Sequence, residues 1–242
     1  IKLFVLSILI GSFSPFIYSG HTNASLAGFN PARIIDDAVM SNKNSMSESA
    51  IQVFLKSKNS CSDTNLSRLT GYTATSGYLV WDGTTYTYNL KDGHFVCMAD
   101  ETFNGESAAH IIWLASQDYS INPQVLLVLL QKEQSLVTDT WPNSAQYMSA
   151  TGFACYDNGA PCQGYASGFK MQVRKAANLF HEVLDNRDYD GDGFITNYPV
   201  GPNTILYNPD STRVGYPNTP NRCGSSIVNI QNRATSSLYR YT

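Results

Sequence analysis

The residue of this chain best placed to do chemistry is Glu133, the single acid in an apolar helical segment. Successive helical residues turn by roughly 100°, so Leu126, Leu129, Leu130 and Val137 fall in the same narrow arc as Glu133. A carboxylate in that arc is poorly solvated, and desolvation raises its pKa. A carboxyl that stays protonated near neutral pH can protonate the leaving sugar oxygen in glycosidic cleavage. The alternative is a Glu that turns to solvent or pairs with a neighbouring Lys or Arg.

The segment 121–137, INPQVLLVLLQKEQSLV, predicts the helix that positions this acid. Asn122 suits the N-cap, because its side-chain oxygen accepts a hydrogen bond from a first-turn N–H. Pro123 then takes the first helical position, where its missing N–H costs nothing. Residues 125–130 are all apolar, and a helix apolar on all sides is buried on most of them. We therefore expect the central helix of the core.

The run GESAAHIIWLASQDYSINPQVLLVLLQKEQSLV resembles the catalytic core of bacterial lysozyme-like proteins, which include soluble lytic transglycosylases, goose-type lysozymes and peptidoglycan glucosaminidases. More of the chain, from Phe29 almost to the C-terminus, resembles secreted bacterial proteins often labelled haemagglutinin-like. The segments that carry this second resemblance are FNPARIIDDAVM, MSESAIQVFL, INPQVLLVLLQKEQSLV, ATGFACYDNGAPC, NTILYNP and CGSSIVNIQNRATSSLY. The lysozyme-like resemblance implies that Glu133 is the catalytic acid. Two positions depart from the pattern: Gln134 replaces the usual Ser, and residues 151–154, TGFA, replace G-L-M-Q.

The segment 138–164 predicts a long irregular loop directly after the acid. Long loops inside a compact domain are usually functional, so this one can form a wall beside Glu133. Its candidate second carboxylates are Asp139 and Asp157. A separation of about 6.5–9.5 Å from Glu133, with a water between, would indicate inverting hydrolysis. Without such a partner, one Glu acting first as acid and then as base suits a transglycosylase.

Five further residues are candidate substrate contacts near this acid. The aromatic candidates can stack on sugar rings or serve core and loop packing instead, and Gln172 lies near the start of a predicted helix at 167–184. The candidates are Tyr147, Gly152, Phe153, Tyr165 and Gln172.

The stretch 188–196, DYDGDGFIT, has the alternating carboxylates and sixth-position glycine that open a calcium-binding EF-hand loop. Pro199 stands where the loop needs a bidentate Glu, so any site is incomplete or finished elsewhere. The candidate ligands of a structural Ca²⁺ are Asp188, Asp190, Asp192, Phe194 and Thr196. The alternative is a solvated acidic turn, and the expected catalysis needs no cofactor.

The five cysteines indicate disulfides if the chain is exported. Cys155 and Cys162 bracket a short loop that a bridge would close, and Cys61 and Cys97 flank the Tyr-rich stretch. Cys223 is left over. No zinc-type spacing of Cys or His occurs.

Composition indicates an extracellular protein. Residues 1–27 resemble a signal peptide without its initiator Met, and the apolar run is interrupted well short of the roughly 20 residues of a membrane anchor. After cleavage we expect no membrane partner. A net charge of −3 without a basic patch argues against nucleic acid. Abundant tyrosine, 15 residues, and a low charged fraction of 14% suit sugar-binding surfaces.

These patterns predict an α+β fold, mainly α, with a lysozyme-like core, a small β-hairpin subregion and an irregular C-terminal segment. Residues 28–103 hold an N-terminal helix and the hairpin, 104–187 the catalytic core, and 188–242 the calcium loop and an extension of the same domain. The hairpin is indicated by Tyr-rich strands around Asp82-Gly83, a two-residue turn signal.

The function that the sequence favours is a secreted or cell-surface glycosidase, a muramidase or lytic transglycosylase, that cleaves peptidoglycan through Glu133. The alternative is a catalytically silent cell-wall or glycan-binding adhesin on the same fold, which the missing G-L-M-Q equivalent and the resemblance to haemagglutinin-like proteins favour. The sequence gives no indication of the oligomeric state.

Overall fold

The computed structural model describes residues 28–58, 77–81, 86–90, 97–139, 142, 144–155, 162–188, 197–206 and 225–241. In 77–81 and 86–90 it describes the backbone alone. The predicted signal peptide, Asp157, most of the predicted calcium loop, Cys61 and Cys223 lie outside these ranges. One compact unit extends from Pro31 to the end of the chain. No helix in the described ranges is long and apolar enough to cross a membrane.

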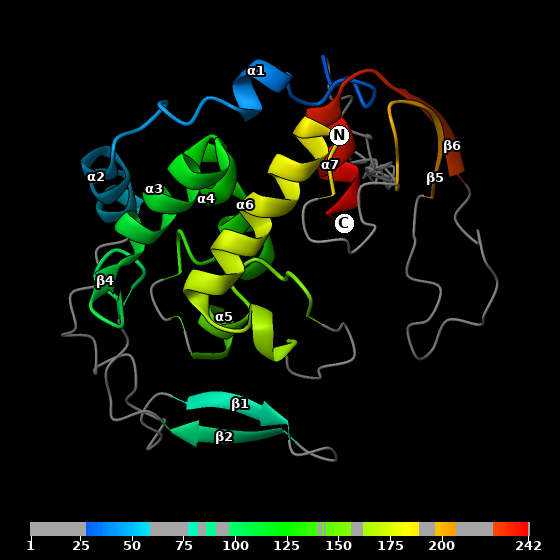
Figure 1. The fold of residues 1–242 in the computed structure, drawn as a ribbon. Helices are drawn as coiled ribbons and strands as arrows, with labels where there is room; N and C mark the ends of the chain where they lie inside the picture. The colour runs from blue at the N-terminus through cyan, green and yellow to red at the C-terminus, as the bar shows by residue number, and fades with distance from the viewer. Residues whose placement is uncertain are drawn as a thin grey trace, which may run out of the picture. The chain divides into compact units, whose positions relative to one another are not determined.

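Helices dominate the described chain (Figure 1). Helix α3 packs against α2, α4 and α6, and α6 also packs against α7. The elements are α1 (Asp37–Met40), α2 (Glu48–Lys58), α3 (Ala108–Tyr119), α4 (Pro123–Gln134), α5 (Ser144–Met148), the short 3₁₀ helix η2 (Gly164–Ala166), α6 (Phe169–Asp185) and α7 (Arg233–Arg240).

Three two-stranded antiparallel sheets accompany these helices in the described ranges. Strand β1 (Gly77–Trp81) pairs with β2 (Tyr86–Leu90), β3 (Thr102–Phe103) with β4 (Glu106–Ser107), and β5 (Gly201–Leu206) with β6 (Ser225–Ile230). The predicted α+β, mainly helical fold is confirmed. Pairing of the Tyr-rich hairpin begins at Trp81 and Tyr86, so four residues separate the strands instead of the predicted two. The C-terminal segment contains a paired hairpin and a helix, so it is more regular than predicted.

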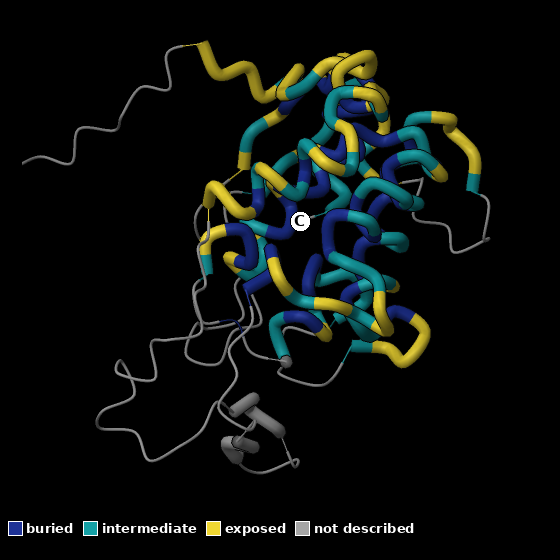
Figure 2. Tube along the Cα trace, turned by 90° about the vertical axis from the view of Figure 1, so that its left-hand side faces the viewer, coloured by how far each residue is buried: buried dark blue, intermediate teal, exposed yellow. Residues whose placement is uncertain are grey.

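Helix α4 contributes to the apolar core, but α3 is the helix that packs against α2, α4 and α6, so the predicted central position of α4 is not what the structure shows. Leu126 and Leu130 are fully buried, and they join side chains from α2, α3 and α6 in one cluster. Figure 2 shows these buried stretches interleaved with exposed ones along the chain. Burial on most sides is confirmed, but Val128 is 68% exposed, so α4 keeps one solvent-facing strip.

The start of α4 is fixed by Asn122, as predicted. Its side-chain oxygen accepts hydrogen bonds from the Gln124 N–H at 2.9 Å and the Ser45 hydroxyl at 2.5 Å, and its amide donates to the Val39 carbonyl at 2.9 Å. One buried side chain therefore caps α4 and also ties it to α1, through Val39, and to the loop after α1, through Ser45. The helix ends at Gln134, so Val137 lies beyond it and does not continue the helical arc.

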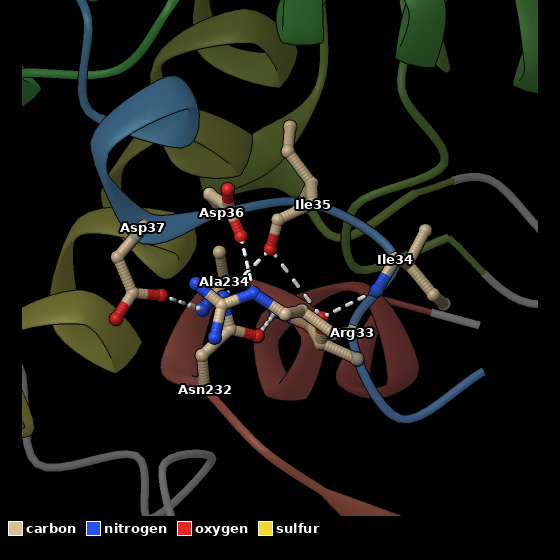
Figure 3. A network of polar contacts seen from close by, with 8 residues as sticks. Arg33, Ile34, Ile35, Asp36, Asp37, Asn232 and Ala234 are labelled. Atoms are coloured by element: carbon tan, nitrogen blue, oxygen red, sulfur yellow. Dashed lines mark hydrogen bonds and ion pairs between the residues drawn. The ribbon is translucent and has the colours of Figure 1, made fainter. Parts of the chain in front are cut away.

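The two ends of the compact unit meet at the first turn of α7 (Figure 3). The Asn232 amide donates to the Ile35 carbonyl at 2.7 Å. The Ala234 N–H donates to Asp37 Oδ1, also at 2.7 Å. A carboxylate at a helix N-terminus is favoured by the free N–H groups and by the helix dipole. Residues 31–37 and the start of α7 thus form a clamp, which we call the terminal clamp.

We expect Asn122→Ala to lower the free energy of unfolding by about 2 kcal/mol, because the helix loses its cap and buried polar partners are left unsatisfied. Urea unfolding followed by circular dichroism measures this loss. Gln124→Ala, at the neighbouring exposed position, is the control and should change stability by no more than about 0.5 kcal/mol. Equal losses in the two variants would contradict the capping role.

Candidate active site

Glu133 occupies the last turn of α4, and its side chain is 24% exposed. Oε1 accepts a hydrogen bond from Lys132 Nζ at 2.6 Å. Glu133 thus pairs with a neighbouring Lys, which was the alternative expected from the sequence. Among the described residues no donor bonds Oε2. The carboxylate therefore presents one engaged oxygen and one that is available.

The available oxygen lies against Gly152. A Cβ built on Gly152 would stand 3.2 Å from Glu133 Oε2 and 3.7 Å from Cδ. Gly152 also has φ +74°, a conformation that residues with a side chain rarely adopt. Both conditions require glycine here. The sequence predicted Gly152 as a substrate contact, and the structure places its backbone beside the candidate acid.

Gln172 holds the loop that carries Gly152. Its side chain is fully buried on α6. Oε1 accepts hydrogen bonds from the Thr151 N–H and the Phe153 N–H, each at 3.1 Å, and Nε2 donates to the carbonyls of Phe153 at 2.8 Å and Ala166 at 2.7 Å. The amide is thus used inside the protein. Gln172, predicted as a substrate contact, is instead a structural anchor of the loop.

A disulfide closes the far end of the same loop. Cys155 and Cys162 are bonded, with Cα atoms 3.9 Å apart, which confirms the predicted bridge. The Gln163 N–H donates to the Ala154 carbonyl at 2.9 Å beside it. Cys97 is also disulfide-bonded; its predicted partner Cys61 lies outside the described residues.

Tyr241, at the end of α7, is a site residue that sequence reasoning missed. Its hydroxyl donates to the Thr151 carbonyl at 3.1 Å, and its ring lies 5.1 Å from that of Phe180 on α6. Burial raises the pKa of Tyr241, and the negative charge of Glu133 raises it further. The phenol therefore remains a hydrogen-bond donor at neutral and moderately alkaline pH.

The remaining loop candidates have different surroundings. Asp139 Oδ2 accepts from Gln146 Nε2 at 2.7 Å, and the same amide donates to the Gln134 carbonyl at 2.9 Å. Asp139 therefore helps tie the loop to the end of α4. The other predicted carboxylate, Asp157, lies outside the described residues.

Two of the three aromatic candidates have surroundings that the structure describes in detail. Tyr147 is buried, and its ring lies 5.1 Å from Phe103 and 6.0 Å from Phe169. Burial also raises the pKa of Tyr147. It belongs to the core, which was the alternative to a sugar contact. Tyr165 is 52% exposed, with the Lys175 ammonium 5.4 Å from its ring centre. Phe153 is partly exposed.

The calcium prediction is not tested, because of its candidate ligands only Asp188 is described, and those from Asp190 to Thr196 lie outside the described residues. Across the described ranges no three His, Cys, Asp or Glu side chains gather as a metal site. The calcium loop stays a prediction.

The profile of the family described as "LasA, N-terminal domain" matches residues 33–190. The chain belongs to this family. No curated protein and no solved structure matches the chain, so the lysozyme-like resemblance of α4 stays a prediction. The matched region contains Glu133, Gly152 and Gln172 but stops before α7, so Tyr241 comes from outside it.

We expect Gly152→Ala to destabilise the fold by about 1–2 kcal/mol from backbone strain and to displace the Glu133 carboxylate. Gly105→Ala is the matched control, because Gly105 also has a positive φ, +84°, yet nothing lies within 4 Å of its built Cβ. The extra loss in Gly152→Ala, measured by thermal unfolding, isolates the contact with Glu133. Equal losses of thermal stability in both variants would show that the contact with Glu133 does not contribute to the effect.

Proposed function

We propose that this protein is an exported glycosidase, a muramidase or lytic transglycosylase, that cleaves the glycan strands of peptidoglycan with Glu133 as the catalytic acid. The observation that carries the proposal is the meeting of Glu133 and Gly152. The residue facing Oε2 has no side chain, and the Glu133 side chain is 24% exposed; both support access of a substrate oxygen to this carboxyl group. The chemistry requires this, since the leaving sugar oxygen must receive a proton.

The family relation supports the coarser part of this proposal. Membership of the LasA N-terminal domain family supports a secreted protein that acts on the bacterial cell wall. It does not favour a glycosidic bond over a peptide bond. The choice of the glycosidic bond therefore rests on Glu133 and its surroundings.

Among the residues that the structure describes, the surroundings of Glu133 favour a mechanism with a single carboxyl group; the other candidate carboxylate, Asp157, lies outside them. Asp139 is engaged with Gln146 at 2.7 Å, which is a structural use of its charge. In the proposed reaction Glu133 donates its proton to the leaving oxygen and then, as the carboxylate, accepts a proton from the attacking hydroxyl. If water attacks, the product has a reducing end. If a hydroxyl of the same sugar attacks, the product is an anhydro sugar that contains one water less.

The second candidate function is a wall-binding protein without turnover. It is favoured by the 2.6 Å ion pair between Lys132 and Glu133, because this pair gives the carboxylate a partner inside the protein that does not depend on turnover. The two functions share the partner, peptidoglycan, and differ only in whether covalent bonds break.

We expect Glu133→Gln to remain folded and to release soluble fragments from purified peptidoglycan sacculi about 10²–10⁴ times more slowly than the unchanged protein, the usual contribution of a general acid. Folding should survive because a partly exposed ion pair such as Lys132–Glu133 contributes only about 0–1 kcal/mol. Glu101→Gln removes a carboxylate that bonds only its neighbouring N–H in the described contacts. It should keep full activity.

Mass analysis of the released fragments distinguishes the outcomes. Reducing ends indicate a hydrolase and anhydro ends a transglycosylase. New amino termini without cleaved glycosidic bonds would indicate a peptidase and contradict the proposed glycosidase. Binding to sacculi without any release would establish the silent binder. Full activity of Glu133→Gln would rule out Glu133 as the acid.

A further inference from the structure

The peptide group between Thr151 and Gly152 is held at both of its polar atoms. The Gly152 N–H donates to the Ser149 carbonyl at 2.9 Å. The Thr151 carbonyl accepts from the Tyr241 hydroxyl at 3.1 Å. These two groups lie in one rigid plane, so the two bonds together fix the orientation of that plane.

The orientation of this plane decides where Gly152 lies. Rotation of the plane would change φ of Gly152, which is +74° in the structure and brings its backbone against Glu133 Oε2. Glycine resists such rotation less than any other residue, because both signs of φ are open to it. Gly152, which the contact with Glu133 requires, therefore does not fix its own φ. The Thr151–Gly152 peptide group must be held by bonds to other residues.

Gln172 does not supply this restraint at the carbonyl. Its amide bonds the Thr151 N–H and the Phe153 backbone, which lie on either side of the Thr151–Gly152 peptide group. The Thr151 carbonyl is bonded by Tyr241. The ring of Tyr241 is itself set by packing near Phe180, a fully buried residue of α6, so the hydroxyl approaches from a fixed direction.

We propose that Tyr241 is a positioning residue of the active site, whose hydroxyl fixes the Thr151–Gly152 peptide plane and so holds Gly152 against the Glu133 carboxylate. This inference rests on the proposed function for its effect on activity. Tyr241 lies outside residues 33–190, which match the family, so the proposal extends the site beyond that region. Tyr241 follows α7, and the terminal clamp holds α7 in place.

Tyr241→Phe tests the proposal, because it removes the hydroxyl and keeps the ring that packs near Phe180. Tyr239→Phe is the matched control. Its hydroxyl also belongs to α7 and donates to a backbone carbonyl, that of Pro31, at 3.0 Å, so both variants lose one bond of the same kind. A general loss of stability would therefore appear in both variants alike.

The first measurement is steady-state cleavage of a soluble peptidoglycan glycan fragment by the full chain. We expect Tyr241→Phe to lower kcat by about three- to tenfold, the value of one hydrogen bond, with KM unchanged. Tyr239→Phe should leave kcat unchanged. Equal kcat values in the two variants, or a change in KM alone, would overturn the positioning role.

The second measurement reads the geometry without any activity. In ¹H–¹⁵N spectra, the amide of Gly152 should shift and exchange with solvent faster in Tyr241→Phe than in Tyr239→Phe. An unchanged Gly152 amide would overturn the proposal even if the protein is an active enzyme. A shifted amide in a protein that releases no sugar would uphold the positioning of Gly152 and reject the proposed function, so the two failures are distinguishable.

Discussion

The amide of Gln172 is the interaction on which the candidate site depends. A buried amide that lacked partners would destabilise the fold, and this one meets its needs with the backbone of residues 151–153 and with Ala166. The loop of residues 151–153 must therefore pass alongside Gln172 on α6. That path brings Gly152 to the end of α4, where Glu133 stands. The closeness of acid and glycine thus follows from the satisfaction of one buried polar group on a different helix.

The site also joins parts of the chain that are far apart in sequence. Helix α4 supplies the acid, the loop after α5 supplies the glycine, α6 supplies the anchor, and the end of α7 supplies a hydroxyl. Each part is set by a different kind of interaction. The acid is set by an apolar core and a capped helix, the loop by an amide and a disulfide, and α7 by the terminal clamp. Such division allows a loop with little regular structure to have a defined position.

The sequence predicted those features that depend on near neighbours. Asn122 and Pro123 marked the start of α4, the spacing of Cys155 and Cys162 marked their bridge, and helical periodicity marked α6. It was least reliable where partners come from distant segments. Tyr147 could not be told from a sugar contact, because its burial comes from Phe103 and Phe169. Gln172 was assigned to the substrate because its partners Thr151 and Phe153 lie about twenty residues away in the sequence. Tyr241 gave no local signal at all.

The terminal clamp has a consequence for how the protein matures. Its bonds join residues 34–37 to residues 232–235, at separations of about two hundred positions. Contacts of such long range close late, since they must first overcome the entropy of a long loop. Ribosomes deliver a chain from its N-terminus onward. The helices α2 to α6 can therefore collapse early, while the contact of Tyr241 with the loop forms only after α7 has emerged.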